Sequence, residues 1–269
     1  MMKNTKNVKK ILALTLALVL CLCAIVACSK KEDTLVIGYT LYEPMNYEDA
    51  NGNLVGFDTE LAKAVAEKLD MEVKFQLIDW PQKYSELSSG NISCIWNGFT
   101  SNCADDDGVQ RSDKVDFSYA YMKNEQCVVV LKENAATLNT KEALAGKTGA
   151  AEDGSAGETV AKKFLGETGE YIGCSNQMAT LTELMGKKVD FVVIDKTMAK
   201  TIIGKGNYAS LTMVESIDIE SEEYSIGFKK GSELTAKVNE ALKELAADGT
   251  MMELAKKYGL ENYVITDFD

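Results

Sequence analysis

The 269-residue chain contains no histidine and only one arginine, Arg111. The lack of histidine excludes the Ser-His-Asp and Cys-His arrangements of nucleophilic catalysis, so carboxylates remain as the available acids and bases. The seven cysteines include no CxxC pair, and a zinc site with the usual Cys/His spacing is therefore unsupported. These absences predict no catalytic residue of those classes, no bound metal and no cofactor.

Four cysteines lie in the part of the chain that we expect to fold. Cys94 and Cys127 stand in apolar, strand-like runs and are predicted to be small core residues. Cys103 could form a disulfide, and Cys174 is the fourth thiol. The sequence leaves the pairing open, because disulfide partners cannot be deduced from sequence alone. We expect mostly free thiols.

The first 28 residues carry the pattern of an export signal. Four lysines within residues 1–10 precede an apolar run over 11–26, which is short for a membrane span. The segment that ends in Ala27-Cys28 resembles a bacterial lipobox, in which the thiol of Cys28 is acylated. We expect residues 1–27 to be a signal peptide and residues 28–33 a lipidated tether. An uncleaved anchor and an ordinary signal peptide are the alternatives.

The remainder of the chain is strongly acidic. Residues 1–27 hold four lysines and no acidic residue, so the mature chain keeps 25 basic and 41 acidic residues, a net charge of about −16. A surface of that sign repels nucleic acid and anionic headgroups, and we expect neither as a partner. The length of roughly 240 residues favours two domains.

Two short motifs fail on spacing. Gly146-Lys147-Thr148 looks like the end of a phosphate-binding loop, but Lys141 stands where that loop requires its first glycine. Residues 105–108 resemble part of a calcium loop, yet Cys103 and Lys114 occupy its first and last ligand positions. We interpret residues 105–108 as a solvated acidic loop.

Strand and helix signals alternate along the rest of the chain. Strands are predicted over 34–40, 71–78, 92–96, 147–151, 189–195 and 225–228, and helices over 59–69, 81–88, 140–145, 155–164, 178–185, 232–247 and 250–258. Asp58 is expected to cap the first of these helices. The alternation predicts an α/β fold with a parallel or mixed sheet covered by helices.

The two halves of the chain repeat one arrangement. In each, a helix ends at a glycine and the next strand delivers a polar residue, Asn97 or Asp195, at its carboxyl end. Open α/β sheets bind their ligands at this edge. We expect two lobes facing a cleft, lobe 1 from residues 34–125 and 224–269 and lobe 2 from residues 126–223. Hinge crossings are expected near 124–127 and 220–224.

Seven segments of the mature chain carry a family resemblance. They are Tyr42-Glu-Pro-Met, 51–58 with the following helix, 90–93, 115–118, 153–155, 189–195 and 247–250. In this order they are similar to the polar amino acid-binding proteins of bacterial ABC importers, bacterial solute-binding protein family 3. The resemblance implies a two-lobed periplasmic-binding-protein-like fold of type II, without enzymatic activity, that closes on a free amino acid and docks on ABC permease subunits. With the lipobox, it implies a lipoprotein at the extracellular face of the cell membrane, and we expect a monomer.

The resemblance also assigns roles in the cleft. Arg111 supplies the only guanidinium fork, which suits a carboxylate, although the long segment 101–110 allows the alternative of a surface arginine. The other implied ligand-binding residues are Asn97, Gly98 and Thr100 on lobe 1, with Ser155, Ala156 and Asp195 on lobe 2, and the aromatic residues Tyr42 and Trp80. Asp195 would bind the ammonium, the alternative being a helix cap. Tyr42 and Trp80 would sandwich the ligand side chain or belong to the core, whereas Trp96 is assigned to the core.

Two other functions fit the same architecture. Some exported proteins of this fold are dehydratases of cyclic acids, for which Glu43 and Asp195 would be the acid and base. A sensory receptor module is a third interpretation, but no signalling segment follows the last predicted helix. The ligand is left open as well: a basic amino acid would need an additional acid in the side-chain pocket, and Glu43 is one candidate.

Overall fold

The computed structural model describes residues 34–268. The predicted signal peptide, the tether and Cys28 lie outside the described residues. Within residues 34–268, no helix is both long and apolar enough to cross a bilayer.

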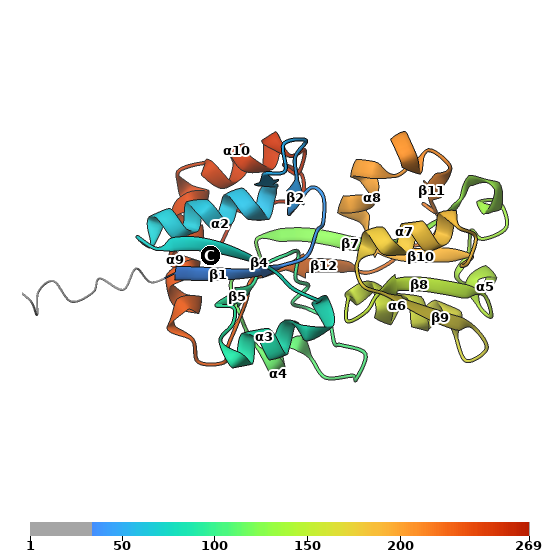
Figure 1. The fold of residues 1–269 in the computed structure, drawn as a ribbon, viewed down its shortest axis with the longest axis horizontal. Coiled ribbons are helices and arrows are strands. Elements are labelled where there is room, and N and C mark those ends of the chain that lie inside the picture. Colours follow the sequence, from blue (N-terminus) through green and yellow to red (C-terminus); the bar gives the residue numbers. More distant parts are fainter. Residues whose placement is uncertain (1–33, 269) are drawn as a thin grey trace, which may run out of the picture. The chain divides into compact units, whose positions relative to one another are not determined.

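The first sheet has five strands in the order β4-β1-β5-β13-β6; β4, β1 and β5 are labelled in Figure 1. Their bounds are β1 Thr34–Tyr39, β4 Glu72–Leu77, β5 Cys94–Ile95, β6 Asp116–Phe117 and β13 Gly227–Phe228. β1 and β5 run parallel, while β13 runs antiparallel to both of its neighbours. The sheet is therefore mixed, as the sequence predicts. A short hairpin, β2 Tyr47–Glu48 with β3 Leu54–Val55, stands apart from it.

The second sheet has six strands and is also mixed. Five of them follow the order β11-β7-β10-β8-β9, and β12 pairs with β7. Their bounds are β7 Met122–Leu131, β8 Thr148–Glu152, β9 Glu170–Cys174, β10 Phe191–Asp195, β11 Leu211–Met213 and β12 Ser221–Tyr224. β8 lies parallel to β9 and β10, so the carboxyl ends of these strands meet at one edge.

We call the part built on the five-stranded sheet lobe 1 and the part built on the six-stranded sheet lobe 2. The chain passes between them along β7 and β12, which pair antiparallel from Ser221 opposite Glu125 to Tyr224 opposite Met122. Two hydrogen-bonded strands thus form the connection, at the places where the sequence predicts the crossings (Figure 1).

Helices cover both sheets. Lobe 1 carries α2 Phe57–Lys68, α3 Lys83–Ser89, α4 Arg111–Lys114, α9 Glu233–Ala247 and α10 Thr250–Lys257; lobe 2 carries α5 Lys141–Leu144, α6 Ala156–Leu165, α7 Gln177–Met185 and α8 Lys196–Ile202. Short 3₁₀ turns occur at Trp80–Gln82, Lys132–Asn134 and Gly206–Tyr208. The last two helices, α9 and α10, contact α2, so the end of the chain packs on lobe 1 as predicted (Figure 1).

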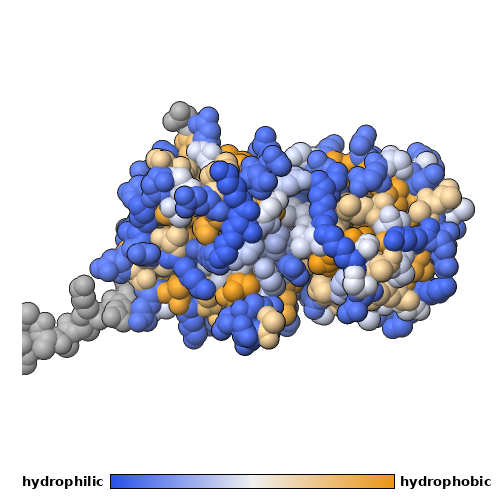
Figure 2. All heavy atoms as spheres, turned by 90° about the horizontal axis from the view of Figure 1, so that it is seen from above, coloured by the Kyte–Doolittle hydropathy of each residue, from blue (hydrophilic) through white to orange (hydrophobic). Residues whose placement is uncertain are grey.

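The apolar stripe of α2 explains its position. Leu61, Ala62 and Val65 are fully buried, since residues three and four apart share one helix face. Cys94 and Cys127 are buried among the same apolar residues, and Trp96 is a core side chain, as expected. Hydrophilic residues spread over the visible face of both lobes, with apolar residues between them (Figure 2).

Two local predictions were wrong. Asp58 is not the cap of α2, because the helix begins at Phe57 and Gly56 is its N-cap; the Asp58 carboxylate turns inward and accepts the N–H of Gly98. The acidic loop is not uniformly solvated either. Asp105 is largely buried and pairs with both Arg111 and Lys114, at 2.7 and 2.9 Å.

Candidate functional site

A small enclosed cavity lies where the two lobes meet. Its lining consists of Trp80, Asn97, Gly98, Thr100 and Arg111 from lobe 1, and Gln126, Glu152, Ser155, Ala156, Gln177 and Asp195 from lobe 2. Every ligand-binding residue predicted from the sequence lines this cavity except Tyr42. The free volume is about 20 Å³, which suits a water molecule rather than an amino acid. A larger ligand therefore requires the lobes to part or the lining groups to move.

Arg111 enters the cavity because the long loop before it folds back on itself. Ala104 pairs with Gln110, and the N–H of Arg111 donates to the carbonyl of Cys103, which returns the chain to Thr100. The loop therefore does not carry Arg111 to the surface. Its side chain is 1 % exposed and packs 5.0 Å from the centre of the Phe99 ring.

The guanidinium of Arg111 is held by three oxygen atoms. Its Nε donates to Asp105 at 2.7 Å, Nη1 to the carbonyl of Thr100 at 3.1 Å and Nη2 to the carbonyl of Gly154 at 3.2 Å. Burial alone raises the pKa of Asp105, but the charge of Arg111 and the hydrogen bond from Lys114 together lower it to about 2. The guanidinium of Arg111 is thus ionised, and its Nη2 atom contacts Gly154 of lobe 2.

Asp195 stands at the carboxyl end of β10 and is 7 % exposed. It is the N-cap of α8, yet its side chain makes no capping hydrogen bond. Its carboxylate instead accepts hydrogen bonds from uncharged donors: Tyr224 at 2.6 Å, Asn124 at 2.6 Å, Gln126 at 2.8 Å, and Gln177. Burial raises the pKa of Asp195, and these donors oppose the rise. Asp195 therefore places a buried, hydrogen-bonded carboxyl group in the lobe 2 wall of the cavity.

The residues that follow β5, Asn97 and Gly98, present backbone groups to the cavity rather than free side-chain groups. The amide of Asn97 is occupied by Thr40 and Asn46, so it joins the loops beneath the cavity. Gly98 has φ of 58°, and a Cβ there would lie 2.7 Å from the Tyr42 ring. Only glycine fits this turn without strain.

The first turn of α6 forms the opposing wall. Ser155 is the N-cap, and its hydroxyl accepts the N–H of Glu158 at 3.2 Å. This hydroxyl is therefore engaged in the helix itself, and Ala156 contributes no polar side chain. The helix N-terminus still favours an anion through its dipole and unpaired amides.

The two predicted aromatic residues differ in their placement. Trp80 lines the cavity and packs edge-on against Phe99 at 5.5 Å. Tyr42 lies behind the cavity wall, where its hydroxyl bonds the hydroxyl of Tyr224 at 2.8 Å. Tyr224 in turn contacts Asp195, so Tyr42 reaches the site only through another side chain. Glu43 does not line the cavity.

Asp195 is one of three carboxylates that lobe 2 places in or beside the cavity within residues 34–268. Glu152, at the end of β8, lines the cavity, and Glu222 of β12 adjoins it. Glu222 accepts hydrogen bonds from Asn124 at 3.1 Å, Gln126 at 3.0 Å and Thr100 at 3.3 Å. Burial and then the charge of Asp195 raise the pKa of Glu222 to about 7 and that of Glu152 to about 8.

Gln126 and Gln177 line the cavity and Lys83 lies beside it, and none of the three was predicted from the sequence. Lys83 is 2 % exposed and its ammonium donates to the carbonyl of Gly154 at 2.9 Å, the same oxygen that Arg111 contacts. Burial and then the charge of Arg111 lower the pKa of Lys83 to about 7. Glu152 ends a strand just as Asp195 does, so its position in the sequence could have identified it as a cavity residue.

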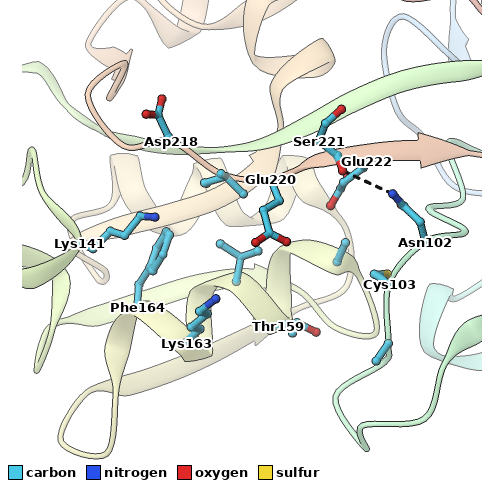
Figure 3. Close-up of a pocket in the computed structure, with 14 residues that line it drawn as sticks. Asn102, Cys103, Lys141, Thr159, Lys163, Phe164, Asp218, Glu220, Ser221 and Glu222 are labelled. Atoms are coloured by element: carbon cyan, nitrogen blue, oxygen red, sulfur yellow. Dashed lines mark hydrogen bonds between the residues drawn. The ribbon is translucent and has the colours of Figure 1, made fainter.

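A wider groove adjoins the cavity, and Figure 3 shows its lining. Its volume is about 240 Å³, and Ala156 belongs to both spaces. Glu222 lines the groove and is hydrogen-bonded to Gln126 of the cavity lining. Phe164 and Val160 of α6 belong to its lining. Lys163 and Glu220 extend into the groove from opposite sides (Figure 3). The long segment 101–110 contributes Asn102 to this lining, and the side-chain amide of Asn102 donates to the carbonyl of Ser221 at 3.5 Å.

Metal chemistry finds no support in this arrangement. Within residues 34–268, no group of three or more Cys, Asp or Glu side chains has the geometry to hold a metal ion. The cavity therefore offers an ionised fork on one side and buried carboxylates on the other, a combination suited to binding a molecule that carries both charges.

Comparisons with known proteins agree with this description. The chain is 29 % identical to the arginine-binding extracellular protein ArtP of Bacillus subtilis (strain 168), with 81 % of this chain and 82 % of the relative covered. A solved ancestral arginine-binding protein bound to arginine superposes with a TM-score of 0.76 at 33 % identity, covering 84 % of this chain and 97 % of that one. An ancestral amino acid-binding protein described as a precursor of cyclohexadienyl dehydratase gives 0.73 at 29 % identity, covering 85 % and 96 %.

The structural neighbours share the type II periplasmic-binding-protein fold, which confirms the predicted two-lobed architecture. The sequence profile of one family matches residues 35–261, nearly all of the described chain. The chain therefore belongs to the bacterial extracellular solute-binding proteins, family 3.

Proposed function

We propose that this solute-binding receptor captures one free amino acid between its lobes, with Arg111 binding the α-carboxylate and Asp195 the α-ammonium. The observation that carries the proposal is that these two side chains, from different lobes, line one cavity. Burying both charges of a zwitterion requires a partner for each, and the two residues supply them.

The remaining lining groups complete the proposed site. Thr100, Gly98 and the N-terminus of α6 at Ser155 and Ala156 add polar and backbone groups for the carboxylate. Trp80 packs on the ligand side chain, and Tyr42 supports Asp195 through Tyr224. Asn97 holds the lobe 1 loop in place.

Ligand capture is coupled to closure of the lobes. Gly154 receives Lys83 and Arg111 from lobe 1, and a carboxylate entering the cleft would take over these donors. The proposed lobes span 34–125 with 224–269, and 126–223, so that opening bends β7 and β12. A ligand that contacts both lobes favours the closed form, which a permease can distinguish from the open one.

We further propose that the protein acts as a lipid-anchored monomer on the extracellular side of the cell membrane, with Cys28 as the acylated residue. Replacement of Cys28 by alanine should move the protein from the membrane fraction into the medium. Retention of that variant in the membrane would contradict the anchor.

The protein is proposed to bind its ligand without chemical change. The runner-up, a cyclic-acid dehydratase, is supported by one neighbour described as a precursor of such an enzyme. Its candidate acid Glu43 stands away from the cavity. Incubation with cyclic acids should give no product, and turnover would favour the enzyme.

The test of the binding proposal is calorimetry with modified ligands. An amino acid that binds should lose nearly all affinity as its α-amide, which lacks the carboxylate, and as its N-acetyl derivative, which lacks the ammonium. Tight binding of either derivative would refute the proposed contacts.

A further inference from the structure

Glu152 is a cavity carboxylate that the proposed grip on the α-groups does not use. It is 4 % exposed, and its Oε1 atom is buried without a hydrogen-bond partner among the described residues. An unpartnered buried oxygen is costly, so such an atom in a binding cavity indicates a group supplied from outside.

The neighbouring charges show which sign is missing. Asp195 and Glu222 stand close by, and both are already hydrogen-bonded by the amides of Asn124 and Gln126. Of the two cations, Arg111 is paired with Asp105. Lys83 donates to the carbonyl oxygens of Gly154 and Trp80, at 2.9 and 3.4 Å, and forms no ion pair with Glu152.

The charge balance leads to the same conclusion. Counting Glu152, Asp195, Glu222 and Asp105 against Arg111, Lys83 and Lys114, the last of which pairs with Asp105, the fully ionised site carries one negative charge in excess. A zwitterion with a neutral side chain adds no charge, so it leaves the excess unchanged. A ligand with a second positive group reduces it.

The fold places Glu152 where a ligand side chain would pass. β8 and β10 are parallel neighbours with Ala150 opposite Val192, so Glu152 and Asp195 end adjacent strands at one edge of the sheet. Trp80, also in the lining, offers an aromatic surface to the same space. A chain leaving an ammonium held at Asp195 therefore has Glu152 within the same cavity.

We propose that Glu152 binds a cationic side chain of the ligand, so that this receptor takes a basic amino acid bearing an ammonium or guanidinium group. This inference rests on the proposed function, because it presumes that Arg111 and Asp195 hold the α-groups. Glu152 then sets specificity while those two residues set the orientation of the ligand.

The test compares arginine with citrulline, which has nearly the same shape but a neutral side chain. Calorimetry on the wild-type protein should show arginine binding about 10- to 100-fold more tightly, the range for a hydrogen bond to a charged group. In Glu152→Gln the ratio should fall to within about threefold. Glu133→Gln is the matched control, since Glu133 lies on lobe 2 in an exposed pair with Lys187; it should keep the wild-type ratio.

Three results would overturn the inference. Equal affinity of the wild-type protein for arginine and citrulline would do so, and this measurement needs no variant. An equal loss of both ligands in a folded Glu152→Gln protein would assign Glu152 to the α-ammonium instead. An unchanged ratio in that variant would remove Glu152 from the ligand. Absence of binding for every amino acid would instead defeat the proposed function itself.

Discussion

Replacing Arg111 by alanine should abolish most ligand binding. The guanidinium is buried, ionised and the only fork in the cleft, and its Nη2 atom already contacts an oxygen of the opposing lobe at 3.2 Å. Removing one partner of a buried charge pair costs about 3–5 kcal/mol, because the other charge stays buried without compensation. That loss corresponds to a decrease in affinity of about two to three and a half orders of magnitude.

Isothermal titration calorimetry measures this loss directly, and the thermal unfolding curve of the variant separates it from a loss of fold. Lys114→Ala is a suitable control, because Lys114 also pairs with Asp105 but does not line the cavity. It should keep the wild-type affinity. An Arg111→Ala protein that is folded and binds with unchanged affinity would show that the carboxylate is held elsewhere.

Three further predictions concern the remaining charges of the cleft and the core. Asp195→Asn should weaken binding by about two orders of magnitude or more in calorimetry. Four donors point at this carboxylate, so the amide leaves at least one of them without an acceptor and the ligand-free unfolding temperature should fall. A folded variant with normal affinity would contradict the role of Asp195 in binding. Burial raises the pKa of Asp58 to about 7, so its ionisation destabilises the fold progressively as pH rises from about 4 to 7. Asp58→Asn should therefore gain stability over the wild-type protein across that range in denaturant titrations, and a constant difference would refute the assignment. Asp106→Asn removes the 2.7 Å ion pair with Lys162. Both side chains are at least a third exposed, so the pair is weak and the ligand affinity should change less than about fivefold. A larger change would mean that this ion pair controls closure of the lobes.

Much of the architecture could be predicted because it depends on local pattern. The apolar stripe of α2 and the helix starts expected at 155 and 232 are readable along a few residues, and the structure begins these helices within two positions of the expected starts. Asp195 was identifiable as the polar end of an apolar strand. Arg111 was identifiable because no other residue offers a planar fork.

The parts that could not be predicted depend on pairing between distant segments. Gln126 joins the site because β7 pairs with β10 in a register that sets it opposite Asp195. The sequence left Tyr42 as either a ligand contact or a core residue, and it lies in the core because Tyr224, far away in sequence, stands between it and Asp195. The burial of Asp105 follows from a loop that folds back on itself, and the acidic run alone gives no sign of it.

The central claim is that residues of opposite charge on the two lobes grip the two charges of one amino acid. A crystal structure with a bound amino acid tests it most directly. We expect a ligand carboxylate oxygen about 3 Å from a guanidinium nitrogen of Arg111, and the ligand ammonium at hydrogen-bonding distance from the carboxylate of Asp195. A bound amino acid whose α-carboxylate or α-ammonium contacts neither side chain would contradict it.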